Sequence, residues 1–420
     1  MPKTPMYRLG GLACVTLLLV LASGSQAEAA PNCGLANAAP ATGIPIPIGS
    51  IVSRTGPEDF SSASRSAAAY FACVNAQGGI GGRPIRYLVQ DDQWDPEIAA
   101  QVAAKLVNDE KVVAMAGSSS QVECGVNSRT YERDGLQIVA ATGVPRECYY
   151  SSQIAPVSNG PRLSSIVMAR YAVEALGARR IACIGFNTAG TGEWVCNGLA
   201  AWGKARNVSV APVLMDPAAD ATSVILDAKA RNPDTILFVL PKGVTVALLV
   251  AAEQQDLGGR IKFVSAASAY DASVPKALGA YWNDRFWSSM EYAQPLDSAD
   301  PETANWRAVL DTYGTASDPR DTFGVSGYLA AKIVATDLLT AKTTTFDRRS
   351  VSAAIRGMPP FADSLLCSPW TFGNGARHNA NHAGRVSVVA EGGWKVVSPC
   401  IQADDPDLVD ILADEAKRPQ

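Results

Sequence analysis

Hydrophobic residues occur along this chain in short continuous runs that alternate with longer amphipathic stretches. A continuous apolar run of about four to eight residues is typical of a strand that is buried on both faces. We therefore expect strands at residues 46–53, 85–90, 112–116, 136–141, 180–186, 208–214, 235–240 and 262–266.

Helices are expected between these strands, where small and apolar residues recur at helical spacing. The glycines within 78–82 end the first helix, because glycine adopts left-handed turns at little cost. Asp95 and Pro96 are typical of a helix start, and the serines at 118–120 could cap another helix. The expected helices lie at 61–75, 97–108, 163–176, 192–206 and 245–255.

This alternation of strands and helices indicates the α/β class, with parallel sheets covered by helices on both faces. The strands are too many for one sheet of ordinary size, and 420 residues are many for one core. We therefore expect two lobes, each a doubly wound parallel sheet. Ligands of such sheets bind beyond the carboxyl ends of the strands.

The N-terminus predicts a signal peptide over residues 1–29. Lys3 and Arg8 precede an apolar run at 9–22, and Ala27 and Ala29 form a small-residue cleavage site. A membrane anchor is the alternative, but a span needs about 20 apolar residues. A lipid anchor at Cys14 fits less well, because the apolar core follows the cysteine. We expect an exported protein, periplasmic or extracellular, that is soluble after cleavage.

Composition excludes several classes of function. The chain carries 36 basic and 40 acidic residues, which gives a net charge of −4 and no basic surface for nucleic acid. Only two histidines occur, His378 and His382, within a Gly/Asn-rich segment that we interpret as an exposed loop. Gly190 and Gly192 lack the third glycine of a dinucleotide-binding turn. We expect no metal, no cofactor and no enzyme activity, and we interpret 401–420 as a solvated acidic tail.

Nine cysteines suit an oxidising compartment, and eight of them lie beyond the expected signal peptide. Eight cysteines allow 105 pairings, so the sequence alone leaves the connectivity open. Sequential pairing is our preferred prediction, and one or two pairs of buried free thiols are the alternative. The preferred pairs are Cys33–Cys73, Cys124–Cys148, Cys183–Cys196 and Cys367–Cys400.

Residues 74–85 read VNAQGGIGGRPI and resemble the N-A-x-G-G-I-x-G-R-P-I turn of type I periplasmic binding proteins. The resemblance is to the leucine/isoleucine/valine-binding branch, which serves ABC transporters, and it covers about residues 44–400. Other matching segments are TGP at 55–57, DD at 91–92, DP at 95–96, YE at 131–132, DG at 134–135, Phe372, Gly375, Asn379, Val386, VV at 388–389 and GGW at 392–394.

The resemblance implies how the two lobes are built and what they do. The first lobe would comprise 44–157 and 290–356, the second 158–289 and 357–400, and three crossovers would form a hinge. A small solute would bind between the lobes of a monomer, and the closed protein would dock on a membrane permease. A sensory ligand-binding protein that signals to a membrane receptor is the alternative, and an exported enzyme lacks a catalytic constellation.

The resemblance also implies where the ligand would bind in the first lobe. Ser119, Gln121 and Thr142 would meet a ligand carboxylate with hydroxyl groups and helix N-termini. Phe60 would form an apolar wall. The alternatives are that the serines only cap a helix and that Phe60 is a core residue.

The second lobe departs from the amino-acid-binding pattern. The acidic residue that holds a ligand ammonium in the family is replaced by Ala267 in our register, and Thr191 replaces a tyrosine. Lys242 could attract an anionic group or could simply face solvent. We therefore expect a small carboxylate, aromatic acids included, rather than a branched-chain amino acid. A one-residue slip in this register could instead bring Asp271 or Glu193 into the site.

Overall fold

The computed structural model describes residues 1–3, 31–34, 39–188, 190–341 and 345–417. The cleavage site of the predicted signal peptide, and all but the first three of its residues, lie outside this description. Residues 31–420 form one compact unit, and the following paragraphs concern that unit. Among the described helices, none is both long enough and apolar enough to cross a bilayer.

The first lobe is built on a sheet whose strand pairs are all parallel. Its main order is β2-β1-β3-β5-β7, and the two-residue strands β4 and β6 continue it beyond the ends of β3 and β5. Most of these strands are apolar and buried, as expected for a sheet that is covered on both faces. The strands are β1 (Ile46–Val52), β2 (Ile85–Asp91), β3 (Ala114–Ala116), β4 (Ser119–Ser120), β5 (Ile138–Ala140), β6 (Thr142–Gly143) and β7 (Ile154–Pro156).

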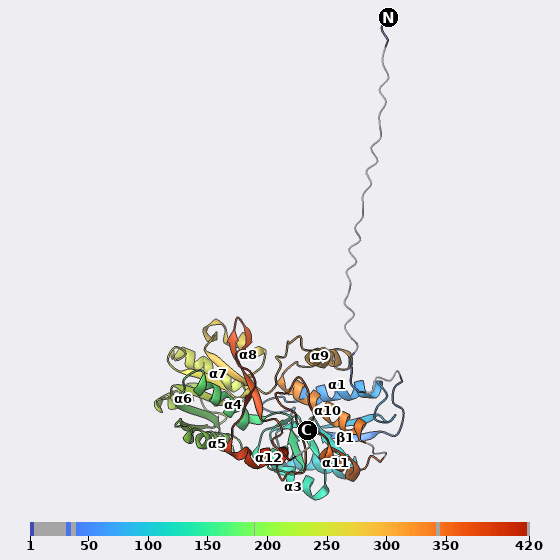
Figure 1. Cartoon of the computed structure of the whole chain (residues 1–420). Coiled ribbons are helices and arrows are strands. Elements are labelled where there is room, and N and C mark those ends of the chain that lie inside the picture. The colour runs from blue at the N-terminus through green and yellow to red at the C-terminus, as the bar shows by residue number, and fades with distance from the viewer. Residues whose placement is uncertain (4–30, 35–38, 189, 342–344, 418–420) are drawn as a thin grey trace. The chain divides into compact units, whose positions relative to one another are not determined.

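Helices from distant parts of the sequence cover the first sheet. The closest helix pair is α1 with α10, which lie side by side in Figure 1. Gly327 permits this approach, because a Cβ there would come within 1.9 Å of the carbonyl oxygen of Ala63. The helices are α1 (Ser62–Ala76), α2 (Pro96–Ala104), continued by a π-helical turn to Asp109, α3 (Glu123–Asp134), α9 (Pro301–Tyr313), α10 (Thr322–Thr340) and α11 (Arg348–Gly357).

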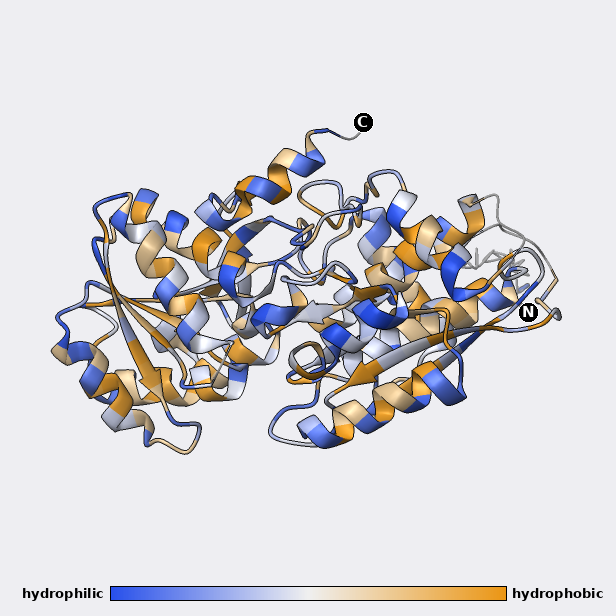
Figure 2. Cartoon of the chain, turned by 90° about the horizontal axis from the view of Figure 1, so that it is seen from below, coloured by the Kyte–Doolittle hydropathy of each residue, from blue (hydrophilic) through white to orange (hydrophobic). Residues whose placement is uncertain are grey.

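The second lobe has a sheet in the order β9-β8-β10-β11-β12-β13-β14. The strands from β8 to β12 are parallel, and β13 adds to them in the antiparallel sense. Figure 2 shows mostly hydrophobic strands, with helices that carry hydrophilic residues on their outer sides. The strands are β8 (Arg180–Phe186), β9 (Ser209–Met215), β10 (Thr235–Val239), β11 (Lys262–Ser265), β12 (Phe286–Met290), β13 (Ala383–Ala390), β14 (Gly393–Val396) and β15 (Ile401–Gln402), which pairs with β13. The helices are α4 (Gly160–Glu174), α5 (Gly192–Lys204), α6 (Ala221–Ala230), α7 (Lys242–Gln254) and α8 (Ser273–Leu278).

Three crossovers connect the lobes and form the hinge. They follow β7, β12 and α11, and a single amide holds all three together. Asn381, in the third crossover, donates through Nδ2 to the carbonyl oxygens of Val157 (3.0 Å) and Glu291 (3.1 Å) in the first and second. Asn381 is 1% exposed, so these hydrogen bonds are shielded from water.

The structure contains the four disulfides of the sequential pairing that we preferred from the sequence. Each has a sulfur–sulfur distance near 2.0 Å and Cα atoms between 5.0 and 5.8 Å apart. Cys124–Cys148 ties the first turn of α3 to a short 3-10 helix, η2 (Arg146–Cys148).

The prediction of a solvated acidic end is wrong for residues 401–417. After β15, the chain forms a 3-10 turn and a short helix, α12 (Val409–Glu415), and Leu408 is 2% exposed. Asp405 accepts hydrogen bonds from Arg162 Nε (2.5 Å) and Nη2 (3.0 Å). Asp404 accepts one from the indole of Trp202 at 2.7 Å. Arginine and indole donors thus hold the acidic side chains against the second lobe.

The two histidines also differ from prediction. They lie in an irregular segment, as expected, but both side chains are buried. His378 Nδ1 lies 2.9 Å from the carbonyl oxygen of Ser151, whereas His382 contacts Gln402 and Glu415. In the described part of the chain, no cluster of three or more metal-ligating side chains is present.

Candidate functional site

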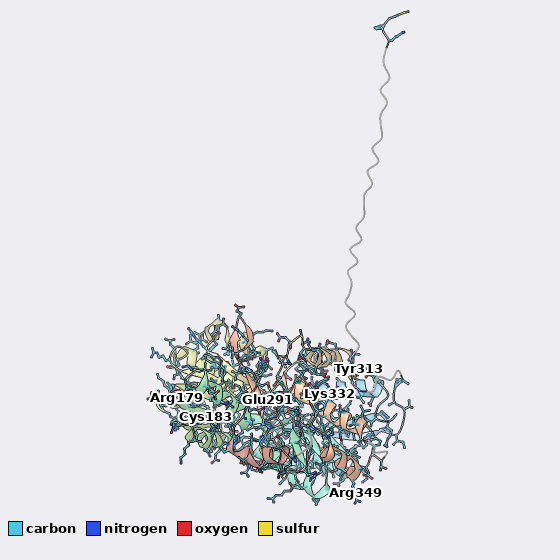
Figure 3. The ribbon with its side chains drawn as sticks, viewed as in Figure 1. Arg179, Cys183, Glu291, Tyr313, Lys332 and Arg349 are labelled. Carbon is cyan, nitrogen blue, oxygen red and sulfur yellow. A yellow bond between two sulfur atoms is a disulfide. The ribbon has the colours of Figure 1, made fainter. Side chains whose placement is uncertain are left out.

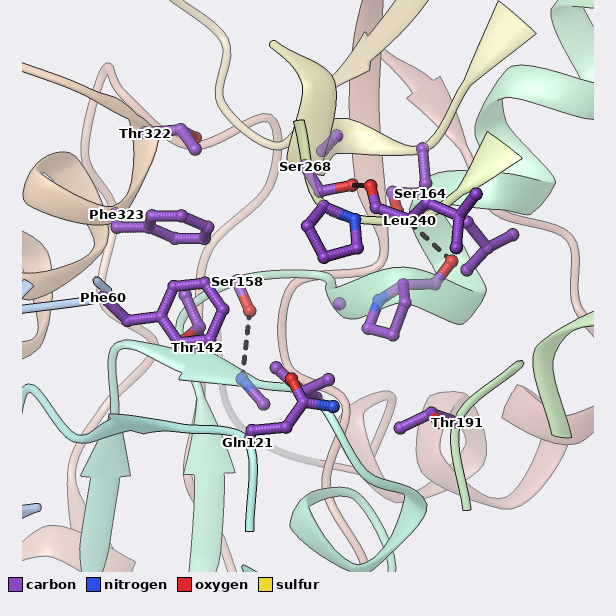
Figure 4. A pocket seen from close by; sticks show the side chains of 18 of the residues that line it. Phe60, Gln121, Thr142, Ser158, Ser164, Thr191, Leu240, Ser268, Thr322 and Phe323 are labelled. Carbon is purple, nitrogen blue, oxygen red and sulfur yellow. Dashed lines mark hydrogen bonds between the residues drawn. The ribbon is translucent and has the colours of Figure 1, made fainter. Parts of the chain in front are cut away.

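A cavity between the lobes is lined by the ends of strands and the starts of helices from both sheets (Figure 4). Its empty volume is about 850 Å³, counting the part that opens to solvent. The cavity lies where sequence reasoning expects a ligand, beyond the carboxyl ends of parallel strands.

The first-lobe wall is aromatic. Phe60 is 5% exposed and lies in the loop that leads from β1 to α1. Its ring packs edge-on against Phe323 at 5.1 Å and stacks on Trp94 at 5.5 Å. Figure 4 shows the rings of Phe60 and Phe323 next to each other, across the cavity from Leu240. This wall suits an apolar and preferably planar group of a ligand.

Two polar side chains of the first lobe also face the cavity, one directly after β4 and one at the start of β6. Gln121 and Thr142 line the cavity. The amide N–H of Gln121 donates to Ser53 Oγ at 3.1 Å, and Ser53 donates to the buried carboxyl of Asp92 at 2.8 Å. The loop that carries Gln121 is thereby fixed by a buried hydrogen-bond network.

Ser119 is not on the cavity surface. Its side chain is fully buried, and its hydroxyl forms a hydrogen bond with that of Thr142. Ser119 therefore orients Thr142 from behind.

The second-lobe wall is formed by the loops that follow β8, β10 and β11. Thr191 and Gly192 come from the first loop, Leu240 and Pro241 from the second, and Ala266, Ala267 and Ser268 from the third. Ala267 therefore lines the cavity at the position where the family resemblance expects an acidic residue.

Lys242 is not among the residues that line the cavity, and its ammonium group is already paired with a carboxylate. Its ammonium forms an ion pair with Asp271 at 2.7 Å, and this pairing lowers the pKa of Asp271 despite the desolvation of its carboxyl. Neither Asp271 nor Glu193 is among the lining residues.

Two carboxyl groups that sequence reasoning missed line the cavity. Burial raises the pKa of Glu58 from 4.5 to about 7, although the nearby Lys242 lowers it in part. Burial also raises the pKa of Glu291 from 4.5 to about 7. Among the lining residues that the structure describes, none is Lys, Arg or His. The cavity thus contains proton-binding groups but no fixed cation.

Helix N-termini supply positive potential instead. Four helices, α4, α5, α7 and α10, begin at or next to residues of the cavity lining. Carboxylates accept hydrogen bonds at the starts of α4 and α10. Gly160 N–H donates to Glu291, and Gly324 N–H donates to Asp321. The starts of α5 and α7, at Thr191 and Pro241, have no side-chain cap. Their first N–H groups are suited to bind an anionic or polar group of a ligand.

The structure therefore brings four of the six predicted ligand-binding residues to one cavity: Phe60, Gln121, Thr142 and Thr191. It leaves Ser119 behind the surface and Lys242 in an ion pair. Glu58 could have been predicted as a lining residue, because it is two residues before Phe60 in the same loop. No such sequence signal existed for Phe323, which lies in the first turn of α10, or for Glu291, which lies in the second crossover.

Comparison with known proteins agrees with this architecture. A model of the periplasmic binding protein family matches residues 45–393. No curated protein matches the chain significantly.

Among solved structures, the solute-binding protein of an R. palustris ABC transporter, in complex with 4-hydroxybenzoate, is similar over 87% of this chain and 100% of its own. The two share 19% identity, with a TM-score of 0.74. A fatty acid ABC transporter substrate-binding protein from Thermomonospora curvata covers 88% and 95% at 19% identity, with a TM-score of 0.72. A leucine-binding protein from Thermotoga maritima covers 86% and 99% at 16% identity, with a TM-score of 0.70.

Identities this low establish a shared fold rather than a shared ligand. The family match covers most of the chain, and the two parallel-sheet lobes with three crossovers agree with it. These relatives bind small molecules and are described as substrate-binding proteins of ABC transporters or as binding proteins. The chain belongs to the periplasmic binding protein family, and its two parallel-sheet lobes have the type I fold of that family.

Proposed function

We propose that this protein captures a small, largely apolar carboxylic acid, aromatic acids included, in the cavity between its lobes. The observation that carries the proposal is the pairing of the Phe60–Phe323 wall with the uncapped N-termini of α5 and α7 on the opposite lobe. An aromatic ring would pack on the first wall. Its carboxylate would accept hydrogen bonds from the first N–H groups of the helices.

The second-lobe wall supports an acid over a branched-chain amino acid. Ala267 offers no carboxylate to a ligand ammonium, and Asp271 is engaged by Lys242. The two carboxyls that line the cavity, Glu58 and Glu291, are buried, and burial favours their neutral form by raising both pKa values to about 7. A charge-assisted hydrogen bond contributes about 1.5–3 kcal/mol, so its loss lowers the affinity for an amine-bearing ligand by about ten- to a hundredfold. Relatives that bind 4-hydroxybenzoate and fatty acids are consistent with this ligand class.

The biological role that we propose is delivery of this solute to an ABC permease by an exported, monomeric protein without enzyme activity. Four disulfides and the signal-like N-terminal sequence support export. A sensory protein is the alternative. Deleting the gene would abolish uptake of the labelled acid in the first case. In the second case, uptake would persist and only the response to the acid would be lost.

We also propose that the third crossover lies close to Asn381 rather than at residue 357. The sequence placed 357–400 in the second lobe. Buried Phe361, Trp370 and Phe372 pack with the core of the first lobe, whereas Ala383 begins a strand of the second sheet.

The binding proposal is tested by thermal shift and calorimetry with benzoate, 4-hydroxybenzoate, hexanoate and leucine. A bound acid present at about 100 times its Kd should stabilise the protein by about 2.7 kcal/mol. We expect stabilisation by at least one acid and none by leucine at the same concentration. Micromolar binding of leucine without binding of any acid would show that the proposed ligand class is wrong. Recovery of the acid unchanged after prolonged incubation is the expected result for a binding protein.

A further inference from the structure

Glu291 lies at the hinge and reaches the ligand cavity. It follows β12 directly, lines the cavity and is 6% exposed. Figure 3 shows its label between those of Lys332 in the first lobe and Cys183 in the second. Its backbone carbonyl accepts from Asn381, and its Oε1 accepts from the N–H of Gly160 at 3.2 Å. The carboxyl is therefore held at a defined place, next to the start of α4.

No cation compensates this carboxyl in the part of the chain that the structure describes. Among the described residues, the only group that lowers the pKa of Glu291 is the N–H of Gly160. The titratable groups that feel its charge are the phenols of Tyr149 and Tyr292, whose pKa values the carboxylate helps to raise. Both phenols are neutral at physiological pH, so they supply no positive charge.

The remaining carboxyl of the cavity, Glu58, lies near Lys242 and Asp321. An acidic ligand would therefore enter a cavity that contains two carboxyl groups and no lining cation. Two buried carboxylates repel each other, and the usual outcome is that one of them holds a proton.

We propose that Glu291 is a specificity residue that is protonated when an acidic ligand is bound and donates a hydrogen bond from Oε2 to the ligand. Oε1 continues to accept from Gly160 N–H. This inference rests on the proposed acidic ligand. The proton comes from solvent whenever Glu291 is ionised in the free protein, so binding takes up one proton at pH values above its pKa.

Burial makes this protonation accessible near neutral pH, because the pKa of Glu291 is raised to about 7. Below that pH the free protein already carries the proton. Above it, the proton must be bound together with the ligand, so the affinity for an acid should fall as the pH rises. The limiting slope for one proton is about tenfold in Kd per pH unit.

The experiment measures the Kd of benzoate for the full mature protein by calorimetry between pH 5.5 and 8.5, with hexanoate as a second probe. Titrations at pH 8 in two buffers of different ionisation enthalpy count the protons taken up. We expect close to one proton at pH 8 and a Kd that rises by up to about tenfold per pH unit above pH 7. Glu291→Gln keeps the shape and can still donate an N–H, so its Kd should be nearly independent of pH. Asp337→Asn is the matched control, because its carboxyl is also buried with a pKa raised to about 7 but lies outside the cavity lining, and it should keep the wild-type slope. Glu58→Gln tests the other lining carboxyl.

Each outcome decides between the two proposals. If neither acid binds at pH 5.5, where Glu291 is protonated, the proposed ligand class fails and this inference fails with it. If an acid binds with the same Kd across the range, or without proton uptake, only the role of Glu291 is rejected. The same holds if Glu58→Gln removes the slope and Glu291→Gln keeps it. Proton counting on the wild-type protein decides the matter even if Glu291→Gln does not fold.

Discussion

The indole of Trp194 stacks on the ring of Tyr149, with centroids 5.9 Å apart and an angle of 29° between the planes. Tyr149 belongs to the first lobe and follows η2, whereas Trp194 lies in the first turn of α5 in the second lobe. Beside this pair, the N–H of Arg146 donates to the carbonyl oxygen of Gly190 at 2.9 Å. These contacts join the lobes next to the cavity, so they help to hold the two lobes together around it.

Replacing Trp194 with alanine should weaken ligand binding. Because a stacked aromatic pair contributes about 0.5–1.5 kcal/mol, Kd for the bound acid should rise by about two- to tenfold. Trp194→Phe retains a ring for Tyr149 and should stay close to wild type. Calorimetry on the three proteins measures this, with melting temperatures of the free proteins as a check on folding. An unchanged Kd in Trp194→Ala would mean that this contact does not favour the closed state.

Much of the fold could be predicted, because parallel strands appear in a sequence as continuous apolar runs. Eight of the strands between Ile46 and Ser265 lie where these runs predict them, to within a few residues, whereas the short strands β4, β6 and β7 were not predicted. The later strand β12 was not predicted, because two of its five residues are serines. Ser288 is nevertheless buried, since its hydroxyl donates to the carbonyl oxygen of Ala266 at 3.2 Å. Strand β12 pairs with β13, which is almost a hundred residues further along the chain. The local sequence pattern cannot predict a pairing over such a distance.

The candidate site could be predicted only in part, for a related reason. A loop after a parallel strand can be located from the sequence, and this suffices for Gln121, Thr142 and Thr191. The direction of a side chain, and the presence of a hydrogen-bond or ion-pair partner, cannot be predicted from the sequence in this way. Ser119 is turned inward to Thr142, and Lys242 meets Asp271, which lies 29 residues further along the chain. Glu291 reaches the cavity only because the crossovers converge at the hinge.

Removing the Cys124–Cys148 disulfide should affect both stability and binding. Loss of the bridge, in a Cys124→Ala/Cys148→Ala variant, should lower the free energy of unfolding by about 3 kcal/mol in the chain-entropy model. Cys148 also packs against Gly143, where an added Cβ would come within 2.8 Å of the cysteine Cβ, and Gly143 lines the cavity. We therefore expect weaker ligand binding as well, measured by calorimetry alongside urea denaturation.

The matched control is the corresponding double alanine variant of Cys33 and Cys73. This bridge closes a longer loop, with a sequence separation of 40 against 24, so its loss should cost at least as much stability. Neither cysteine lines the cavity, so the Kd of the control should not change. Equal effects of both variants on Kd would contradict a local role of Cys148 behind Gly143.

The stability of the protein should fall as the pH rises from about 4 to 8, and Asp337 on α10 should be one cause. Asp337 is 5% exposed, and its Oδ2 has no hydrogen-bond partner among the described residues. Burial raises its pKa from 3.8 to about 7. Between these two pH values the folded protein holds a proton that the unfolded chain has lost, so the free energy of unfolding decreases with rising pH.

Asp337→Asn removes this ionisation with little change of shape. The variant should be more stable than wild type at pH 8 by about 1–3 kcal/mol and should show a flatter dependence on pH. Urea denaturation at pH 5 and pH 8 measures both effects. Asp220→Asn serves as the control, because the Asp220 carboxylate has a lowered pKa as the cap of α6 and its replacement should bring no gain at pH 8. An Asp337→Asn variant that is no more stable than wild type at pH 8 would rule out a charged, unpaired Asp337.

The C-terminal segment 401–417 should be held mainly by the ion pair between Arg162 and Asp405. Their side chains are 13% and 1% exposed, and the guanidinium binds both carboxylate oxygens. Removing one partner leaves a largely buried charge without compensation, which costs about 3–5 kcal/mol. Asp405→Asn should therefore lower the free energy of unfolding by about that amount at pH 7.

The control is Asp227→Asn, which breaks an exposed pair with Arg231 on α6 and should cost less than about 0.5 kcal/mol. Urea denaturation of the three proteins at pH 7 measures the difference, and equal stability of the Asp405 and Asp227 variants would mean that the segment is held by its apolar contacts at Leu408 and Ile411 instead.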